Sequence, residues 1–278
     1  MKITPIAAES LGVRSMALLV ATPDITIFID PAAALGPKRY SLHPHPQELE
    51  ALDAAHRRIE EQLTTCDVIA ITHYHYDHVA RDGAAYDGKT VYAKATDGNI
   101  NKSQRERGVL FAGQFGGTPV YCDGNEYEHG TTVLRFSPPM PHGPPGTRLG
   151  YVVMLTIQAG GQTLLYTSDV QGPVDDAAAS YIIEQQPDIV VADGPPTYLL
   201  GWRFSHANLE HAEANMCHIM EETGCHLLLD HHLLRDLRYQ EQLSRLYGDH
   251  GPRIQAYAEY LGLDNNVLEA RRKQLWRE

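Results

Sequence analysis

The stretch ITHYHYDHVA (71–80) places His73, His75, Asp77 and His78 within six positions, directly after an apolar run. If the chain continued as a strand, the first three would share one face and His78 would point away. If it were helical, His75 would be turned aside. Only a tight loop that leads into a helix at about His78 lets all four converge. Imidazole and carboxylate groups are good ligands for zinc, manganese and iron(II), so the pattern predicts a metal site rather than a histidine-rich surface loop.

Other predicted strands also run into ionisable residues. Apolar runs at 25–30, 162–169, 188–193 and 226–230 lead into Asp30, Asp169, Asp193 and the pair His231-His232. Each single case means little, because acidic residues often begin turns. The repetition would gather these side chains along one edge of a sheet, where open α/β sheets bind their ligands.

The remaining pattern is typical of one layered α/β domain. Further strand-like runs lie at 16–22 and 151–158, and Gly160-Gly161 marks a hairpin. Helices are predicted at 46–63, at 206–223 (capped by Ser205 and ended by Gly224), and at about 99–112, 175–186, 235–247 and 264–277. Hairpins in both halves plus strand–helix alternation predict two mixed β-sheets with helices outside. We expect residues 1–278 to form a single domain, with 249–278 as a C-terminal helical extension.

Composition limits the function classes. The chain has 278 residues, 43% of them hydrophobic and 21% charged, as in ordinary soluble globular proteins. A formal net charge of −12 argues against bulk nucleic-acid binding. The start, MKITPIAAES, lacks the pattern of a signal peptide, and no apolar run could span a bilayer, so we expect a cytoplasmic protein without a membrane partner. Four scattered cysteines without a CxxC pair argue against disulfides and against a thiolate zinc site.

The motif THYHYDH resembles the H-x-H-x-D-H signature of the metallo-β-lactamase-fold hydrolases. The resemblance covers most of the chain, because the later motifs follow in the family's order: SPPMPHGPPG with His142, LLYTSD with Asp169 and LLLDHHLLRD with His231. It implies a four-layer αββα sandwich with the site on one edge. The segments DHHLLRD, DGPPTYLLG and NINKSQRERG look like a largely archaeal branch of this superfamily, which brings no established substrate.

The resemblance also implies a ligand set when it is carried over position by position. One metal would be held by His73, His75 and His142, and a second by Asp77, His78 and His231, with Asp169 between the two. Asp30, in IFIDP, would support the metal loop without binding a metal. His231 is preferred to His232 as the last ligand because it directly follows the strand and Asp230. The cofactor expected is two divalent metal ions, zinc first, with manganese or iron as alternatives.

Such a centre predicts hydrolysis by a hydroxide bridging two metal ions. Two metals ~3.5–4 Å apart can share a water molecule, lower its pKa and hold it for attack. The catalytic residues would be Asp77, Asp169 and His232, while the general acid stays open among Asp77, His232 and His206. The chain has no GxSxG, GxGxxG or P-loop motif, which argues against a serine nucleophile and against nucleotide binding of those types.

Two segments are candidates for substrate binding. Lys102 and Arg105, with Arg107 nearby and Arg203 from a later segment, could hold phosphate groups; alternatively they form a solvated helix face. Tyr198, in DGPPTYLLGWRF, could wall the pocket and donate a hydrogen bond to a metal-bound oxygen, or could simply pack under the next helix.

The leading hypothesis is therefore a metal-dependent hydrolase, with a phosphodiester substrate marginally ahead of an acyl compound such as a lactone or thioester. A non-catalytic metal-binding regulatory module is an alternative, although such a module would be expected to lose ligands. A di-iron redox site is disfavoured, because members of the superfamily with that chemistry replace the second histidine by an acid, and His75 occupies that position here. The partner is a small-molecule or phosphodiester substrate, and the sequence leaves the oligomeric state open.

Overall fold

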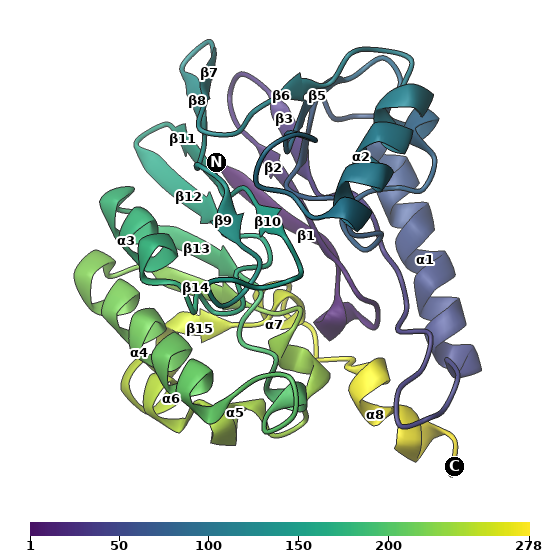
Figure 1. Ribbon diagram of the computed structural model, residues 1–278, viewed down its shortest axis with the longest axis vertical. Helices are drawn as coiled ribbons and strands as arrows, with labels where there is room; N and C mark the ends of the chain where they lie inside the picture. Colours follow the sequence, from purple (N-terminus) through teal and green to yellow (C-terminus); the bar gives the residue numbers. More distant parts are fainter.

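The computed structural model describes residues 1–278 and contains two large sheets that lie face to face (Figure 1). The N-terminal sheet follows chain order: β1 (Lys2–Ala8), β2 (Met16–Ala21), β3 (Thr26–Ile29), β4 (Val68–Ile71), β5 (Thr90–Ala93) and β6 (Val120–Tyr121). Strands β1 to β3 pair antiparallel, and β3 to β6 pair parallel. The carboxyl ends of β3 and β4 therefore lie at the same edge.

The C-terminal sheet has seven strands in the order β15-β14-β13-β12-β11-β8-β7. They are β7 (Glu126–His129), β8 (Thr132–Phe136), β11 (Leu155–Ala159), β12 (Gln162–Tyr166), β13 (Ile189–Ala192), β14 (His226–Leu229) and β15 (Ile254–Gln255). Strands β12 to β15 are parallel, which again brings several carboxyl ends to one edge. A short ribbon of β9 (Met140–Pro141) and β10 (Tyr151–Val152) lies between the hairpin strands β8 and β11 in sequence.

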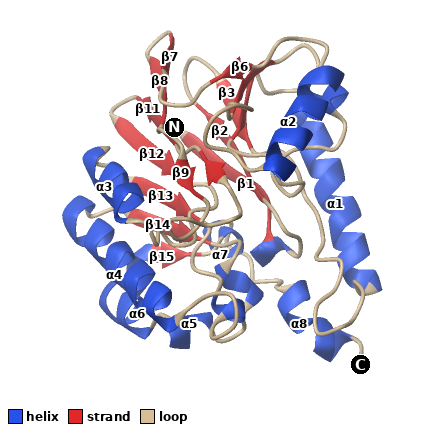
Figure 2. Cartoon of the chain, viewed as in Figure 1, coloured by secondary structure: helices blue, strands red, loops and turns tan.

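Helices cover the outer face of each sheet (Figure 2). The N-terminal sheet carries α1 (Pro46–Leu63) and α2 (Lys102–Gln114), and the C-terminal sheet carries α3 (Asp176–Glu184), α4 (His206–Thr223), α5 (Tyr239–Gln242) and α6 (Ser244–His250). The helix α4 has the predicted ends: Ser205 caps it through the amide of Asn208, and Gly224 ends it at a φ of 68°. No helix combines the length and the apolar composition that a membrane span requires.

Three apolar layers hold these elements together. Side chains such as Leu18, Ile27, Phe136 and Ile157 fill the space between the two sheets. A second layer packs α1 and α2 on the N-terminal sheet, and a third packs α3, α4 and α6 on the C-terminal sheet. The αββα sandwich expected from the sequence is thereby confirmed.

Two predicted elements are interrupted. The predicted strand 151–158 is divided into β10 and β11, because the amide of Val153 leaves the ladder and donates to the carbonyl of Thr72, beside the metal loop. The predicted helix 235–247 is broken into short pieces, because Leu243 adopts a non-helical φ of −114° and ψ of 45°. Strands β1, β5 to β9 and β15 were not predicted.

The C-terminal residues return to the body of the fold. After β15 the chain forms α7 (Tyr257–Tyr260) and α8 (Leu268–Leu275), which lies near the first turn of α1 (Figure 1). Arg272 of α8 makes a fully buried bidentate ion pair with Glu48 of α1, at 2.7 and 2.8 Å. Residues 249–278 thus contribute a strand and two helices that are anchored to both halves.

Candidate metal centre

Three strands that lead to the centre end in a sharp turn made by a non-glycine residue. Asp30 after β3, Ser168 after β12 and His231 after β14 have φ angles of 46°, 58° and 49°. This left-handed conformation costs about 1–3 kcal/mol for a residue with a side chain, and it persists where the surroundings enforce it. Here the turns bring the side chains of Asp30, Asp169 and His231 into one cluster.

The metal-binding loop closes after a single turn. The carbonyl of His75 accepts hydrogen bonds from the amides of His78 and Val79, each at 2.9 Å. The predicted helix beginning at about His78 is wrong, because the chain continues irregularly to a 3-10 segment at Gly83–Tyr86. One turn is enough, since Asp30 from the neighbouring strand accepts a hydrogen bond from Nδ1 of His78 at 2.8 Å and anchors the loop.

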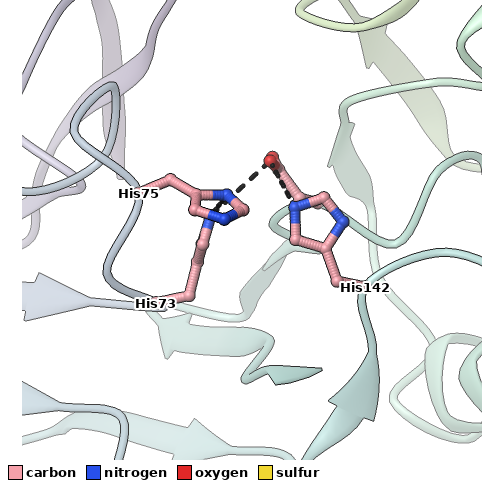
Figure 3. A group of neighbouring side chains, drawn as sticks. His73, His75 and His142 are labelled. Carbon is pink, nitrogen blue, oxygen red and sulfur yellow. Dashed lines mark hydrogen bonds and ion pairs between the residues drawn. The ribbon is translucent and has the colours of Figure 1, made fainter. Parts of the chain in front are cut away.

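The first donor set consists of His73, His75, His142 and Asp169. The rings of its three histidines reach the same space from two segments, His73 and His75 from the metal-binding loop and His142 from the chain after β9 (Figure 3). Nε2 of His73 lies 3.0 Å from Nδ1 of His75, and Nε2 of His142 lies 3.1 Å from Oδ2 of Asp169. His73, His142 and Asp169 are buried, so the set is shielded from solvent.

The second donor set consists of Asp77, His78 and His231. Nε2 of His231 lies 3.3 Å from Nε2 of His78 and 3.8 Å from Oδ2 of Asp77. Asp169 adjoins this set as well, because its Oδ1 lies 3.2 Å from His78 and 3.6 Å from His231. The two oxygens of one carboxylate therefore face two different donor sets, an arrangement suited to bridging.

Buried atoms without partners show that this cluster fits a metal. Both ring nitrogens of His142 and Oδ1 of Asp169 are buried and make no well-aligned hydrogen bond, even though Nε2 of His142 lies 3.1 Å from Asp169 and Oδ1 lies 3.2 Å from His78. Buried polar atoms almost always have a partner. Imidazole nitrogens and carboxylate oxygens are the donors that zinc and similar divalent ions accept. A divalent ion would satisfy these atoms.

Four of the donors also have charge states that suit a cation, whereas burial is outweighed at His78 and His231 by neighbouring carboxylates, which raise the pKa of both. Burial, followed by neighbouring histidines, lowers the pKa of His73 well below its ordinary value and that of His75 to about 3. Both rings are therefore neutral at pH 7 and keep a lone pair for a metal. Burial alone would raise the pKa of Asp77 and of Asp169, but the charges of His78 and His231 outweigh it and lower both. Both acids are thus ionised, as ligands must be.

Three histidines of the centre are each oriented by a buried acid. The pairs, from ring Nδ1 to carboxylate oxygen, are His78–Asp30 at 2.8 Å, His231–Glu9 at 2.8 Å and His232–Asp193 at 2.7 Å. Such partners fix the ring orientation and the nitrogen that faces a metal. The sequence pointed to a supporting role for Asp30 and placed Asp193 at the end of a predicted strand, but it gave no signal for Glu9.

Arg235 is a second residue that sequence reasoning missed. It is 3% exposed, and its Nε donates to Oε1 of Glu9 at 2.5 Å. Its Nη2 lies 3.1 Å from Nε2 of His231 and 3.7 Å from Oδ2 of Asp77. A signal was present, because Arg235 lies four residues after His231 in the motif LLLDHHLLRD.

The two adjacent histidines occupy different places. The structure groups His231 with Asp77 and His78, whereas His232 belongs to a further possible metal-binding group with Asp169 and His231. Nε2 of His232 lies 3.8 Å from Oδ2 of Asp169, and the side chain is 10% exposed, whereas that of His231 is fully buried. His232 therefore stands at the more open side of Asp169.

The residues proposed for substrate binding do not all reach the centre. Lys102 is 90% exposed on α2 and pairs with Glu106, and Arg105 donates to the carbonyl of Thr96. Arg203 is exposed and stacks on the ring of Trp202. These three side chains lie in solvent, because the helix and loop that carry them turn their buried faces toward the core. The structure thus gives them no contact with the metal ligands.

Tyr198 does lie next to the centre. Its hydroxyl accepts a hydrogen bond from Nη1 of Arg235 at 3.3 Å. The guanidinium of Arg39 stacks on the same ring, 4.6 Å from its centroid. Nε of Arg39 is buried without a hydrogen-bond partner, so Arg39 has an N–H group beside Tyr198 that could donate to a ligand.

A pocket of about 530 Å³ lies beside the metal-binding loop. Its lining is mostly apolar and comes from α1 and from the segment after Asp30. Tyr76, which lies between the ligands His75 and Asp77, forms part of the wall together with Arg81. The guanidinium of Arg81 stacks on the ring of Tyr76 at 4.0 Å.

Comparison with known proteins gives close relatives in archaea. No protein-family model matches the chain. A UPF0282 protein of Methanopyrus kandleri is 43% identical over 291 aligned residues, which cover 99% of each chain. A UPF0282 protein of Korarchaeum cryptofilum is 40% identical, covering 99% of this chain and 94% of the relative.

Solved structures share the fold at low sequence identity. The isothiocyanate hydrolase from Delia radicum gut bacteria superposes with a TM-score of 0.56 at 15% identity, covering 92% of this chain and 95% of that one. The metallo-β-lactamase fold protein YhfI from Bacillus subtilis gives 0.52 at 15% identity, covering 91% and 92%. The likeness confirms the metallo-β-lactamase fold.

Proposed function

This chain belongs to the UPF0282 protein family, and from that premise we propose that it is a metal-dependent hydrolase with a dinuclear centre. The observation that carries the proposal is the position of Asp169, whose two carboxylate oxygens face separate donor sets. All seven donors expected from the sequence lie in these sets. A regulatory module without catalysis is a weaker candidate, because nothing in such a role would preserve the complete set.

Metal ions held there, zinc first among the candidates, would lower the pKa of a water molecule and polarise the bond to be broken. The chain's own residues orient and balance the site. Asp169 links the two donor sets, and Asp77 adds a second negative charge at the side of His78 and His231. Thr72 donates to Asp30, which fixes His78 in turn.

His232 is our candidate for the residue that moves a proton at the leaving group. Asp193 holds its Nδ1, so Nε2 is the nitrogen directed at the centre, 3.8 Å from Oδ2 of Asp169. Its partial exposure leaves room for a substrate atom on that side. A positioned histidine of this kind contributes roughly 10²–10⁴-fold to a hydrolytic rate.

A phosphodiester substrate is favoured by positive charge at the edge of the centre. Arg235 and Arg39 flank Tyr198, and the hydroxyl of this tyrosine keeps its own proton to donate. The unpartnered Nε of Arg39 is a further donor for an anionic oxygen. The charge comes from this cluster, and Lys102, Arg105 and Arg203 contribute little because they face solvent.

An acyl substrate, such as a lactone or thioester, is the second candidate. The specific observation in its favour is the largely apolar pocket of about 530 Å³ against Tyr76 of the metal-binding loop. Pockets of this size and lining suit the apolar part of a small molecule. The fold of the isothiocyanate hydrolase adds support for hydrolysis as a reaction class, without indicating a substrate.

The test is hydrolysis of a chromogenic phosphodiester, in parallel with a lactone and a thioester, by zinc- or manganese-loaded protein. Metal-stripped protein and the Asp169→Ala variant serve as controls. We expect turnover that requires metal and is lost in Asp169→Ala, with the phosphodiester fastest. Turnover of acyl compounds alone would favour the second candidate, and no turnover of any substrate by protein with both metals bound would contradict the hydrolase assignment.

A further inference from the structure

A positively charged side chain of the protein lies beside the second donor set. Arg235 is buried, and its guanidinium lies 3.1 Å from Nε2 of His231 and 3.7 Å from the carboxylate of Asp77. By contrast, the strongest electrostatic neighbours of His73 and His75 in the first set are other histidines and the carboxylates Asp77 and Asp169.

The position of this guanidinium is fixed from behind. Glu9 accepts from Nε of Arg235 through Oε1 at 2.5 Å and contacts Nδ1 of His231 through Oε2 at 2.8 Å. One buried carboxylate therefore fixes the positions of both the arginine and the ligand histidine. Hydrogen bonds also fix the backbone next to Glu9 and at His231, since Asp230 accepts from the amides of Ser10 and His231.

Arg235 places a fixed positive charge against the ring of His231. Its Nη2 lies 3.1 Å from Nε2 and 3.4 Å from Nδ1, so the guanidinium rests on the face of the ring and leaves the lone pair of Nε2 free. From there its charge repels additional positive charge at the atom that would bind a metal. Arginine stays charged at all accessible pH values, so this opposition is permanent.

We propose that Arg235 makes the two metal sites unequal, so that the set of His73, His75 and His142 binds a divalent ion tightly and the set of Asp77, His78 and His231 binds a second one more weakly and exchangeably. The guanidinium already balances part of the negative charge of Glu9 and Asp77. A second ion binds only against the repulsion of this fixed positive charge. The inference rests on the proposed dinuclear centre and deepens it, since metal supply then sets how many sites are filled.

The experiment is a zinc titration of metal-stripped protein by calorimetry, with bound zinc counted independently by mass spectrometry. Wild-type protein is compared with Arg235→Met, and Arg39→Met is the matched control, because Arg39 stacks on the same tyrosine without contacting a metal ligand. We expect two binding steps in the wild type. In Arg235→Met the second dissociation constant tightens about tenfold or more, equivalent to ~1.4 kcal/mol, while the first step and both steps of Arg39→Met change little.

A second variant covers the case in which Arg235→Met does not fold. Arg235→Lys keeps a positive charge that can pair with Glu9, but it removes the nitrogen that reaches His231. It should fold and tighten the second step by a smaller factor. The inference is overturned if the second step is unchanged or weaker in the folded variants, or if Arg39→Met has the same effect as Arg235→Met. If the wild type binds no zinc at all, it is the proposed function that fails.

Discussion

The two halves of the metal centre use similar ligands in different surroundings. The half formed by His73, His75 and His142 contains two rings, His73 and His75, that are neutral at pH 7, and the nitrogens of His142 make no hydrogen bond. The half formed by Asp77, His78 and His231 is enclosed by the charged groups of Asp30, Glu9 and Arg235. The first half is therefore prepared for a cation, whereas the second has its charge largely balanced already.

Asp169 belongs to both halves, so its removal should have the largest effect. Asp169→Ala should lower metal-dependent hydrolysis at least about a thousandfold and weaken zinc binding at both steps, because the carboxylate is the one donor shared by the two sets. Asp249→Ala, which removes an exposed acid on α6, is the control. Activity within a few-fold of wild type in Asp169→Ala would exclude the bridging role.

Replacing one histidine from each half separates the halves. His142→Ala should weaken the tight zinc step about a hundredfold, whereas His231→Ala should remove only the weaker step, as judged by calorimetry and by bound zinc per chain. The two variants form a matched pair, since each loses one imidazole. Loss of the tight step in His231→Ala would show that the two halves had been assigned the wrong way round.

The adjacent histidines sharpen the same contrast. His232→Ala should retain both zinc steps yet lower kcat roughly 10²-fold, because Nε2 of this ring faces the centre without belonging to the second donor set. Loss of zinc comparable to that of His231→Ala would make His232 a ligand.

The ion pair between Arg14 and Glu269 should make a pH-dependent contribution to the free energy of unfolding. Burial alone would raise the pKa of Glu269, but the hydrogen bond and charge of Arg14 lower it to about 2. The folded pKa is below the unfolded one, so the stabilisation is present above about pH 4.5 and is lost as the pH falls toward 2. Between pH 5 and 3, urea unfolding of the metal-stripped wild type should lose about 2 kcal/mol more than Glu269→Gln does. Equal losses would contradict the pairing.

The smallest effect is expected on α2. Lys102→Ala and Arg105→Ala should change phosphodiester hydrolysis less than about twofold, because isolated surface charges contribute little across solvent. Arg39→Ala should raise KM several-fold if the anionic group binds at Tyr198. A larger effect from the α2 variants than from Arg39→Ala would indicate that the anionic group of the substrate binds near α2 and not at Tyr198.

Local patterns explain what could be predicted from the sequence. The ligands lie in short segments that directly follow apolar strands, so the motif around His73 and the strand ends at Asp169 and His231 were visible without a structure. The paired sheets and the ends of α1 and α4 were visible for the same reason, since periodicity and caps are encoded locally.

The features that could not be predicted from the sequence depend on packing between distant segments. Glu9 reaches His231 across 222 residues of sequence, and no pattern near it marks that contact. The charges of Lys102 and Arg105 are plain in the sequence, but the face of α2 that they occupy is decided by packing against the core. Likewise, the break at Leu243 and the departure of Val153 toward Thr72 depend on contacts between distant segments.

The most direct measurement is anomalous X-ray diffraction from crystals soaked with zinc at a limiting and at a saturating concentration. We expect two peaks at saturation, both within about 2.0–2.2 Å of Asp169 oxygens, one at His73, His75 and His142 and the other at Asp77, His78 and His231. At limiting zinc only the first should be strongly occupied. A single peak at saturation would contradict the proposed dinuclear centre, and a second peak held by His232 in place of His231 would contradict its proposed ligands.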